Sequence, residues 1–180
     1  QEMLEEAIAR IRAGEVGADL DTDGGWSPQI NLGVPVLIPE DYVPDLDVRL
    51  GLYRRLSGLT TKVELEGFAA ELIDRFGLLP EPAKNLFGVA ALKLDAAPLG
   101  IRKIEIGASE GRILFGDAPD IDTGRLIELV QTQPQYFRFE GGDKLRLFGD
   151  FPTEAARFGI VRKLLALLAG QDVDLSGGSE

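Results

Sequence analysis

The spacing of apolar side chains changes near residue 100 of this chain, and that change restricts the folds open to it. Between residues 45 and 97 apolar residues recur every three to four positions, which is typical of amphipathic helices. Between residues 101 and 148 they alternate in short runs, which is typical of half-buried strands. Helices followed by hairpins indicate an α+β fold rather than a βαβ fold. We therefore expect a helical cluster packed beside antiparallel β-hairpins in a compact single domain.

Local signals place the helices of this arrangement. Asp45 can cap the first, and Thr60 or Thr61 can cap the second. Gly77 follows the second helix, at a position where glycine alone readily adopts positive φ. The expected helices are 45–57, 61–76, 80–97, 122–131 and 152–169.

The strand predictions rest on alternation and on glycine turns. Residues 29–38 alternate, but Pro35 lacks an N–H group, so this segment should be an edge or isolated strand. Phe137 and Phe139 should point inward from the first strand of the second hairpin. The two hairpins are expected at 101–106 with 112–115, and at 135–140 with 144–148.

The composition excludes several functional classes. The chain has 180 residues and no His or Cys, which rules out imidazole catalysis, thiol nucleophiles and thiolate zinc sites. The 19 basic and 30 acidic residues give a net charge of −11, which argues against direct binding of nucleic acid or an anionic membrane. No run of 18 apolar residues is present, as a membrane-spanning helix would need.

The acidic residues offer little catalytic or metal-binding chemistry. Asp19, Asp21 and Asp23 are spaced like the start of a calcium loop, but the twelfth position, Ile30, cannot supply the required carboxylate. We interpret this run as linker and predict no metal or cofactor site. A second acidic group, interpreted as caps and loop residues, leaves a carboxylate-based hydrolase as the alternative function. That group comprises Asp41, Asp45 and Asp47.

Basic and aromatic residues are less informative. We interpret the basic pairs Arg54-Arg55 and Arg102-Lys103 as solvated faces rather than nucleic-acid contacts. The sequence leaves open whether Tyr42 and Tyr53 belong to the core or to an interface.

The helix at 63–76 carries the candidate site. Its apolar side chains fall on one side of a helical wheel, and the opposite side carries acids around two small residues. Gly67 is unfavourable in a helix by about 0.5–1 kcal/mol relative to Ala, and close approach of a second surface would explain it. The composition alone favours a solvated face, with Glu71 and Arg75 as an ordinary i, i+4 pair. The candidate interaction residues are Glu64, Gly67, Ala70, Glu71, Asp74 and Arg75.

Several strings in this chain resemble the C-terminal (TRCF) domain of bacterial transcription-repair coupling factors, the Mfd family. They are ELIDRFGLLPEPAKNL (71–86), PEDYVPDLDVRLGLYRRLS (39–57), LGIRKIE (99–105) and QPQYFRFEGGDKLRL (133–147). The resemblance runs in one order from about residue 29 to residue 168. It implies a helix remnant of an upstream motor domain at 1–14, a flexible linker at 15–28, the regulatory domain at 29–170 and a disordered tail at 171–180.

The resemblance also implies a function. Members of this family act in transcription-coupled DNA repair in the bacterial cytoplasm, and the parent protein is an ATP-dependent DNA translocase whose ATP and Mg sites lie in upstream domains. Their C-terminal domain is non-catalytic and autoinhibitory. It docks on a UvrB-like module and masks the surface that UvrA needs, so UvrA and RNA polymerase are indirect partners. The motif matched by Glu71, Asp74 and Arg75 lies at this docking surface, which reverses the preference for a solvated face. A structural cap on the motor remains a further alternative.

Overall fold

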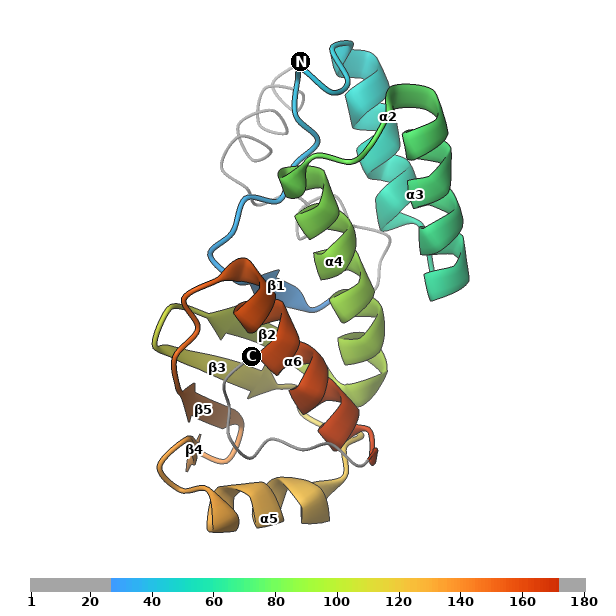
Figure 1. The fold of residues 1–180 in the computed structure, drawn as a ribbon. Coiled ribbons are helices and arrows are strands. Elements are labelled where there is room, and N and C mark those ends of the chain that lie inside the picture. The colour runs from blue at the N-terminus through green and yellow to red at the C-terminus, as the bar shows by residue number, and fades with distance from the viewer. Residues whose placement is uncertain (1–26, 172–180) are drawn as a thin grey trace, which may run out of the picture. The chain divides into compact units, whose positions relative to one another are not determined.

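The predicted succession of helices and strands is present in the computed structural model, which describes residues 27–171 (Figure 1). The helices are α2 (Leu46–Ser57), α3 (Lys62–Phe76), α4 (Glu81–Ala96), the 3₁₀ turn η1 (Ala97–Leu99), α5 (Thr123–Thr132) and α6 (Glu154–Leu168). The strands are β1 (Gln29–Asn31), β2 (Ile101–Ile106), β3 (Glu110–Phe115), β4 (Phe137–Glu140) and β5 (Lys144–Phe148). The predicted α+β class is confirmed.

Two compact units can be separated within the described chain. The first is Val34–Leu94, and the second combines Pro28–Gly33 with the chain from Asp95 onward. The predicted helix at 1–14, nearly all of the linker at 15–28 and nearly all of the tail at 171–180 lie outside the described residues.

The first unit is a group of three helices held by apolar and aromatic contacts. Phe68 of α3 and Phe87 of α4 are both buried, with ring centroids 5.7 Å apart. Tyr53 of α2 is 1% exposed, and its hydroxyl oxygen accepts a 2.5 Å hydrogen bond from the Ile38 N–H. Tyr53 is therefore a core residue, which the sequence had left open.

The ends of α2 and α3 follow the capping predictions. The Asp45 carboxylate accepts hydrogen bonds from the Asp47 and Val48 N–H groups and caps α2. Thr61 caps α3, and Gly77 ends it with φ of 99°. Tyr42 fixes the same end, because its hydroxyl donates to the Gly77 carbonyl at 2.6 Å.

The second unit is built on a five-stranded sheet in the order β1-β2-β3-β5-β4. Both predicted hairpins are present, since β2 pairs with β3 and β4 with β5, each antiparallel. The hairpins join through an antiparallel β3–β5 pair, and β1 adds to β2 in parallel.

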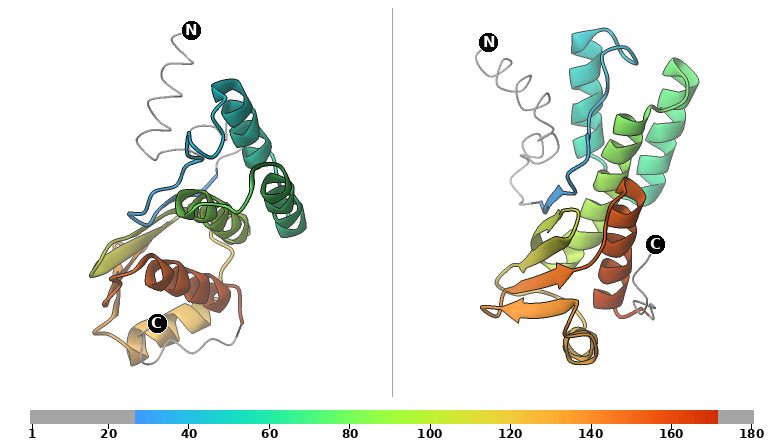
Figure 2. Two further views of the ribbon diagram at one scale, coloured as in Figure 1. Left: turned by 45° about the horizontal axis from the view of Figure 1, so that its top comes forward. Right: turned by 60° about the vertical axis from the view of Figure 1, so that its left-hand side comes forward.

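One face of this sheet supplies the core of the second unit. Ile104, Ile113, Leu145 and Leu147 are fully buried on that face. Helix α6 lies along it, as Figures 1 and 2 show. The Arg157 guanidinium of α6 donates to the Leu32 carbonyl at 2.9 Å, and its Nε donates to the Phe151 carbonyl at 3.0 Å. These bonds tie the segment after β1 to the last helix.

One strand prediction needs correction. The strand expected at 29–38 is an edge strand as predicted, but it ends at Asn31, because Gly33 has φ of 67° and breaks the extended backbone. Phe137 and Phe139 pair with the buried Leu147 and Leu145, so both point to the core face as predicted, but Phe139 is still 40% exposed. Phe139 lies on β4, the last strand of the sheet, where no further strand covers it.

Candidate functional site

Helix α3 brings most of the predicted site residues onto one exposed surface. Leu65, Phe68 and Leu72 are buried on its inner side. The opposite side, called here the α3 outer face, is exposed except at Glu71, which is partly covered. It consists of Glu64, Gly67, Ala70, Glu71 and Asp74. Arg75 lies at its border and is also exposed.

Glu64 participates in the start of the helix. Its carboxylate accepts hydrogen bonds from the N–H of Thr60 at 2.9 Å and from the Thr60 hydroxyl at 3.3 Å. The Glu64 N–H in turn donates to the Thr61 hydroxyl oxygen at 3.1 Å. The Thr60 N–H holds the pKa of Glu64 below its ordinary value. The local role of Glu64 is thus to cap α3.

Glu71 is engaged by two arginines of the same unit. The Arg55 guanidinium of α2 donates to both carboxylate oxygens, at 2.7 and 2.9 Å. Arg75, one turn further along α3, lies 3.8 Å from Glu71 Oε2. The hydrogen bonds from Arg55 lower the pKa of Glu71. Glu71 therefore already has a guanidinium partner within its own fold.

Asp74 and Gly67 are more accessible to a binding partner than Glu64 and Glu71, which are bonded within the fold. Within residues 27–171, no hydrogen bond or ion pair holds the Asp74 side chain, which is exposed. A Cβ placed at Gly67 would meet no atom within 4 Å, so packing does not require glycine there. The outer face thus combines one unpaired carboxylate with a flat, accessible stretch of backbone.

Several residues at this site were not predicted from the sequence. Val63 and Leu78, exposed by 78% and 84%, flank the two ends of the outer face, and Ile73 is 40% exposed. Val63 lies four residues before Gly67, so the helical wheel could have identified it. Arg55 was interpreted as part of a solvated face, and its contact with Glu71 spans two helices, which periodicity does not reveal.

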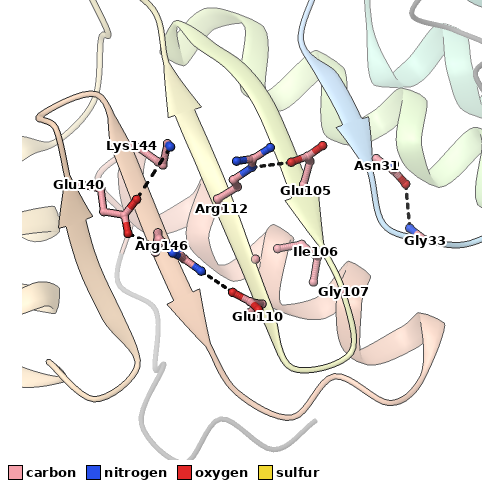
Figure 3. Close-up of a pocket in the computed structure, with 11 residues that line it drawn as sticks. Asn31, Gly33, Glu105, Ile106, Gly107, Glu110, Arg112, Glu140, Lys144 and Arg146 are labelled. Atoms are coloured by element: carbon pink, nitrogen blue, oxygen red, sulfur yellow. Dashed lines mark hydrogen bonds and ion pairs between the residues drawn. The ribbon is translucent and has the colours of Figure 1, made fainter.

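A hollow of about 380 Å³ lies on the sheet of the second unit (Figure 3). Figure 3 shows Glu105 directed toward Arg112, and Glu110 and Glu140 directed toward Arg146. The acids of this hollow are thus already paired with neighbouring bases. The lining residues are Asn31, Gly33, Glu105, Ile106, Gly107, Glu110, Gly111, Arg112, Glu140, Lys144 and Arg146.

The described residues show no metal or membrane feature. Within residues 27–171, no three acidic side chains are grouped as metal ligands. No helix in this part of the chain has the length and apolar character needed to cross a bilayer. The aspartates at 19, 21 and 23 lie outside the described residues. Asp45, one of the acids considered for a hydrolase, serves as the α2 cap.

Comparisons with known proteins converge on one family. Residues 32–126 match the TRCF domain family. The chain is 37% identical over 164 residues to a transcription-repair-coupling factor of Escherichia coli, covering 91% of this chain and 14% of that protein. It is 34% identical over 168 residues to a transcription-repair-coupling factor of Haemophilus influenzae, and this match covers 93% of this chain and 15% of that protein. The chain therefore spans about a seventh of the length of these relatives.

A solved structure shares the fold. It is described as the crystal structure of the C-terminal domain of a transcription-repair coupling factor. The similarity has a TM-score of 0.66 at 16% identity and covers 81% of this chain and 96% of the other.

Proposed function

The chain belongs to the TRCF domain family, and we propose that it is the autoinhibitory, non-catalytic C-terminal domain of a transcription-repair coupling factor. In this proposal it docks on the UvrB-like module of its parent protein and masks the surface that binds UvrA. RNA polymerase and UvrA are then indirect partners. The parent would be an ATP-dependent DNA translocase of the bacterial cytoplasm, with ATP and Mg bound by upstream domains.

The observation that carries the proposal is the composition and exposure of the α3 outer face. Asp74 has no partner within the described residues, and Gly67 and Ala70 leave room for a second surface to approach. Val63, at the start of the helix, adds exposed apolar area beside them. An accessible carboxylate beside an apolar strip suits a protein surface that presents arginine, because arginine pairs bidentately with carboxylates.

Docking of this kind does not need high affinity. A partner linked in the same chain is present at an effective concentration of about millimolar. Charge pairs at the rim mainly provide specificity, and they can be exchanged when the parent protein changes conformation. This supports a clamp that opens when the parent protein engages polymerase and DNA.

The geometry favours this function over a hydrolase. Glycoside hydrolysis needs two carboxylates facing a common cleft, one of them free to protonate the substrate. Asp45 is instead bound by the backbone of α2, and the acids around the sheet hollow are paired with arginines or lysine. A structural cap on the motor differs in one outcome: its deletion would unfold the motor instead of exposing the UvrA-binding surface.

The direct test is charge reversal on the outer face. The double variant Glu71→Arg with Asp74→Arg should abolish binding to the isolated UvrB-like module, measured by titration calorimetry, because like charges would then oppose the partner's arginines. Asp117→Arg with Glu128→Arg is the matched control, since it changes the net charge equally at two exposed acids of the second unit. Asp74→Arg alone leaves the Arg55–Glu71 pair in place and covers the case in which the double variant misfolds. Binding equal to that of the unmodified chain by Asp74→Arg and by a folded double variant would exclude this face.

A further inference from the structure

The bond between Arg55 and Glu71 places an arginine of the chain itself on the docking surface. Its guanidinium meets both carboxylate oxygens, at 2.7 and 2.9 Å, from a different helix. This fork-to-fork geometry is the same one that a partner's arginine would adopt on a carboxylate. Two forks cannot occupy the same edge of one carboxylate. A bidentate bond from a partner therefore requires Arg55 to leave.

Resting on the function proposed above, we propose that Arg55 is an internal competitor that occupies Glu71 in the undocked chain and gives it up to a partner's arginine. Arg55 then determines which partners bind, because an incoming group must replace a bidentate guanidinium. A lysine, with a single point of attachment, is a poorer replacement than an arginine.

The surroundings of Arg55 make such an exchange feasible. The Arg55 and Glu71 side chains are 50% and 39% exposed, so water can solvate either charge once the pair opens. The Arg55 guanidinium carbon also lies 4.4 Å from the centroid of the Phe68 ring. This cation–π contact does not involve Glu71, so Arg55 can keep it after release and remain close enough to return.

Arg75 differs from Arg55 in this respect. It lies 3.8 Å from Glu71 and contacts the carboxylate from the same helix, without a hydrogen bond between the two side chains. Its guanidinium carbon lies 4.8 Å from the Phe76 ring centroid. Arg75 therefore leaves the bidentate edge of Glu71 open, and the competition comes from α2.

The test compares Arg55→Gln with Arg54→Gln in binding to the isolated UvrB-like module. Both substitutions remove one positive charge from neighbouring exposed positions of α2, so the long-range electrostatic change is matched. Arg55→Gln should lower the Kd about two- to fivefold, the range expected for releasing an exposed ion pair, and Arg54→Gln should leave it unchanged. Circular dichroism verifies that both variants remain folded.

The same substitution in a Glu71→Gln chain shows whether the change in Kd depends on Glu71. In a Glu71→Gln chain, Arg55→Gln should no longer change the Kd, because the group for which Arg55 competes is absent. An equal gain in both backgrounds would overturn the proposal, since it would reflect general charge alone. A higher Kd for Arg55→Gln would also overturn the proposal, because it would mean that Arg55 assists binding by holding Glu71 in position for the partner.

The result also separates this proposal from the proposed function. If the unmodified chain binds the module and Asp74→Arg abolishes binding, but Arg55→Gln binds like the unmodified chain, competition by Arg55 is excluded and the docking function stands. If the unmodified chain and the Arg55→Gln chain both fail to bind, the docking function is excluded and the competition with it.

Discussion

At the scale of single residues, substitutions at Tyr53 and Gly67 should change the stability of the chain in opposite directions. The Tyr53 hydroxyl satisfies the N–H of Ile38, which is itself 3% exposed. Gly67 lies on the surface of a helix with no neighbouring atom at the position of a side chain. The first residue supports the fold, whereas the second is not required by it.

Replacing Tyr53 with Phe should destabilise the chain by about 1–3 kcal/mol, the cost of leaving a buried backbone donor unpaired. The free energy of unfolding from urea titration measures this loss. Tyr136→Phe is the matched control, because Tyr136 is 45% exposed and water can replace any bond its hydroxyl makes. Equal stability of Tyr53→Phe and the unmodified chain would show that another group satisfies Ile38.

Replacing Gly67 with Ala should stabilise the chain by about 0.5–1 kcal/mol, because alanine favours the helix and the methyl group meets no neighbour. The same urea titration measures this gain. A gain in stability combined with weaker binding to the UvrB-like module would locate the need for glycine in docking. A loss of stability would contradict the open position seen at Gly67.

At the scale of elements, α3 is held at both ends by residues that could largely be predicted from the sequence. Capping preferences predicted Thr60 or Thr61 at its start and Gly77 at its end, and in the structure the caps are Thr61 and Gly77. The contribution of Tyr42 to the C-terminal end was not predictable, because it donates to a carbonyl 35 positions away. Local signals thus define where this helix lies, and long-range contacts define what secures it.

The acids of α3 make its stability sensitive to pH. Backbone and side-chain donors at Thr60 lower the pKa of Glu64, and the Arg55 guanidinium lowers that of Glu71. A lowered pKa in the folded state means that the stabilisation is complete above the unfolded value, near 4.5, and is lost as the pH falls through the folded value. Stability should therefore decline below about pH 4.5 more steeply in the unmodified chain than in Glu64→Gln with Glu71→Gln. Thermal melts across pH 3 to 7 measure this difference, and parallel curves would contradict it.

The difference between local signals and long-range contacts explains how much of the fold and of the site could be predicted from the sequence. The change in apolar spacing near residue 101 predicted the α+β class, and the glycine-containing turns predicted the hairpins. Both signals are local, so they can be recognised in the sequence. The pairing of β1 with β2 joins segments more than 70 positions apart and leaves no local trace. The engagement of Glu71 by Arg55 was missed for the same reason, since it depends on how α2 and α3 face each other.

At the scale of the whole molecule, charge dominates. The chain carries a net charge of −11, so a cationic partner is attracted over a distance that salt shortens. Binding to the UvrB-like module should weaken steadily between 50 mM and 500 mM salt, in calorimetric or anisotropy titrations. Sucrose at matched osmolality is the control for general solvent effects. An affinity independent of salt would indicate apolar docking, for which Val63 and Leu78 are the most exposed large apolar side chains among the described residues.

The second unit is discontinuous along the chain, since Pro28–Gly33 precedes the first unit and the remainder follows it. During synthesis, the helices of the first unit leave the ribosome while β1 still lacks its neighbour β2. The bonds that Arg157 makes to Leu32 form only when the last helix has emerged. All five strands precede α6, so the apolar face of the sheet is covered only after α6 has been made. A chain truncated before α6 would expose that apolar face, which quality-control proteases can recognise.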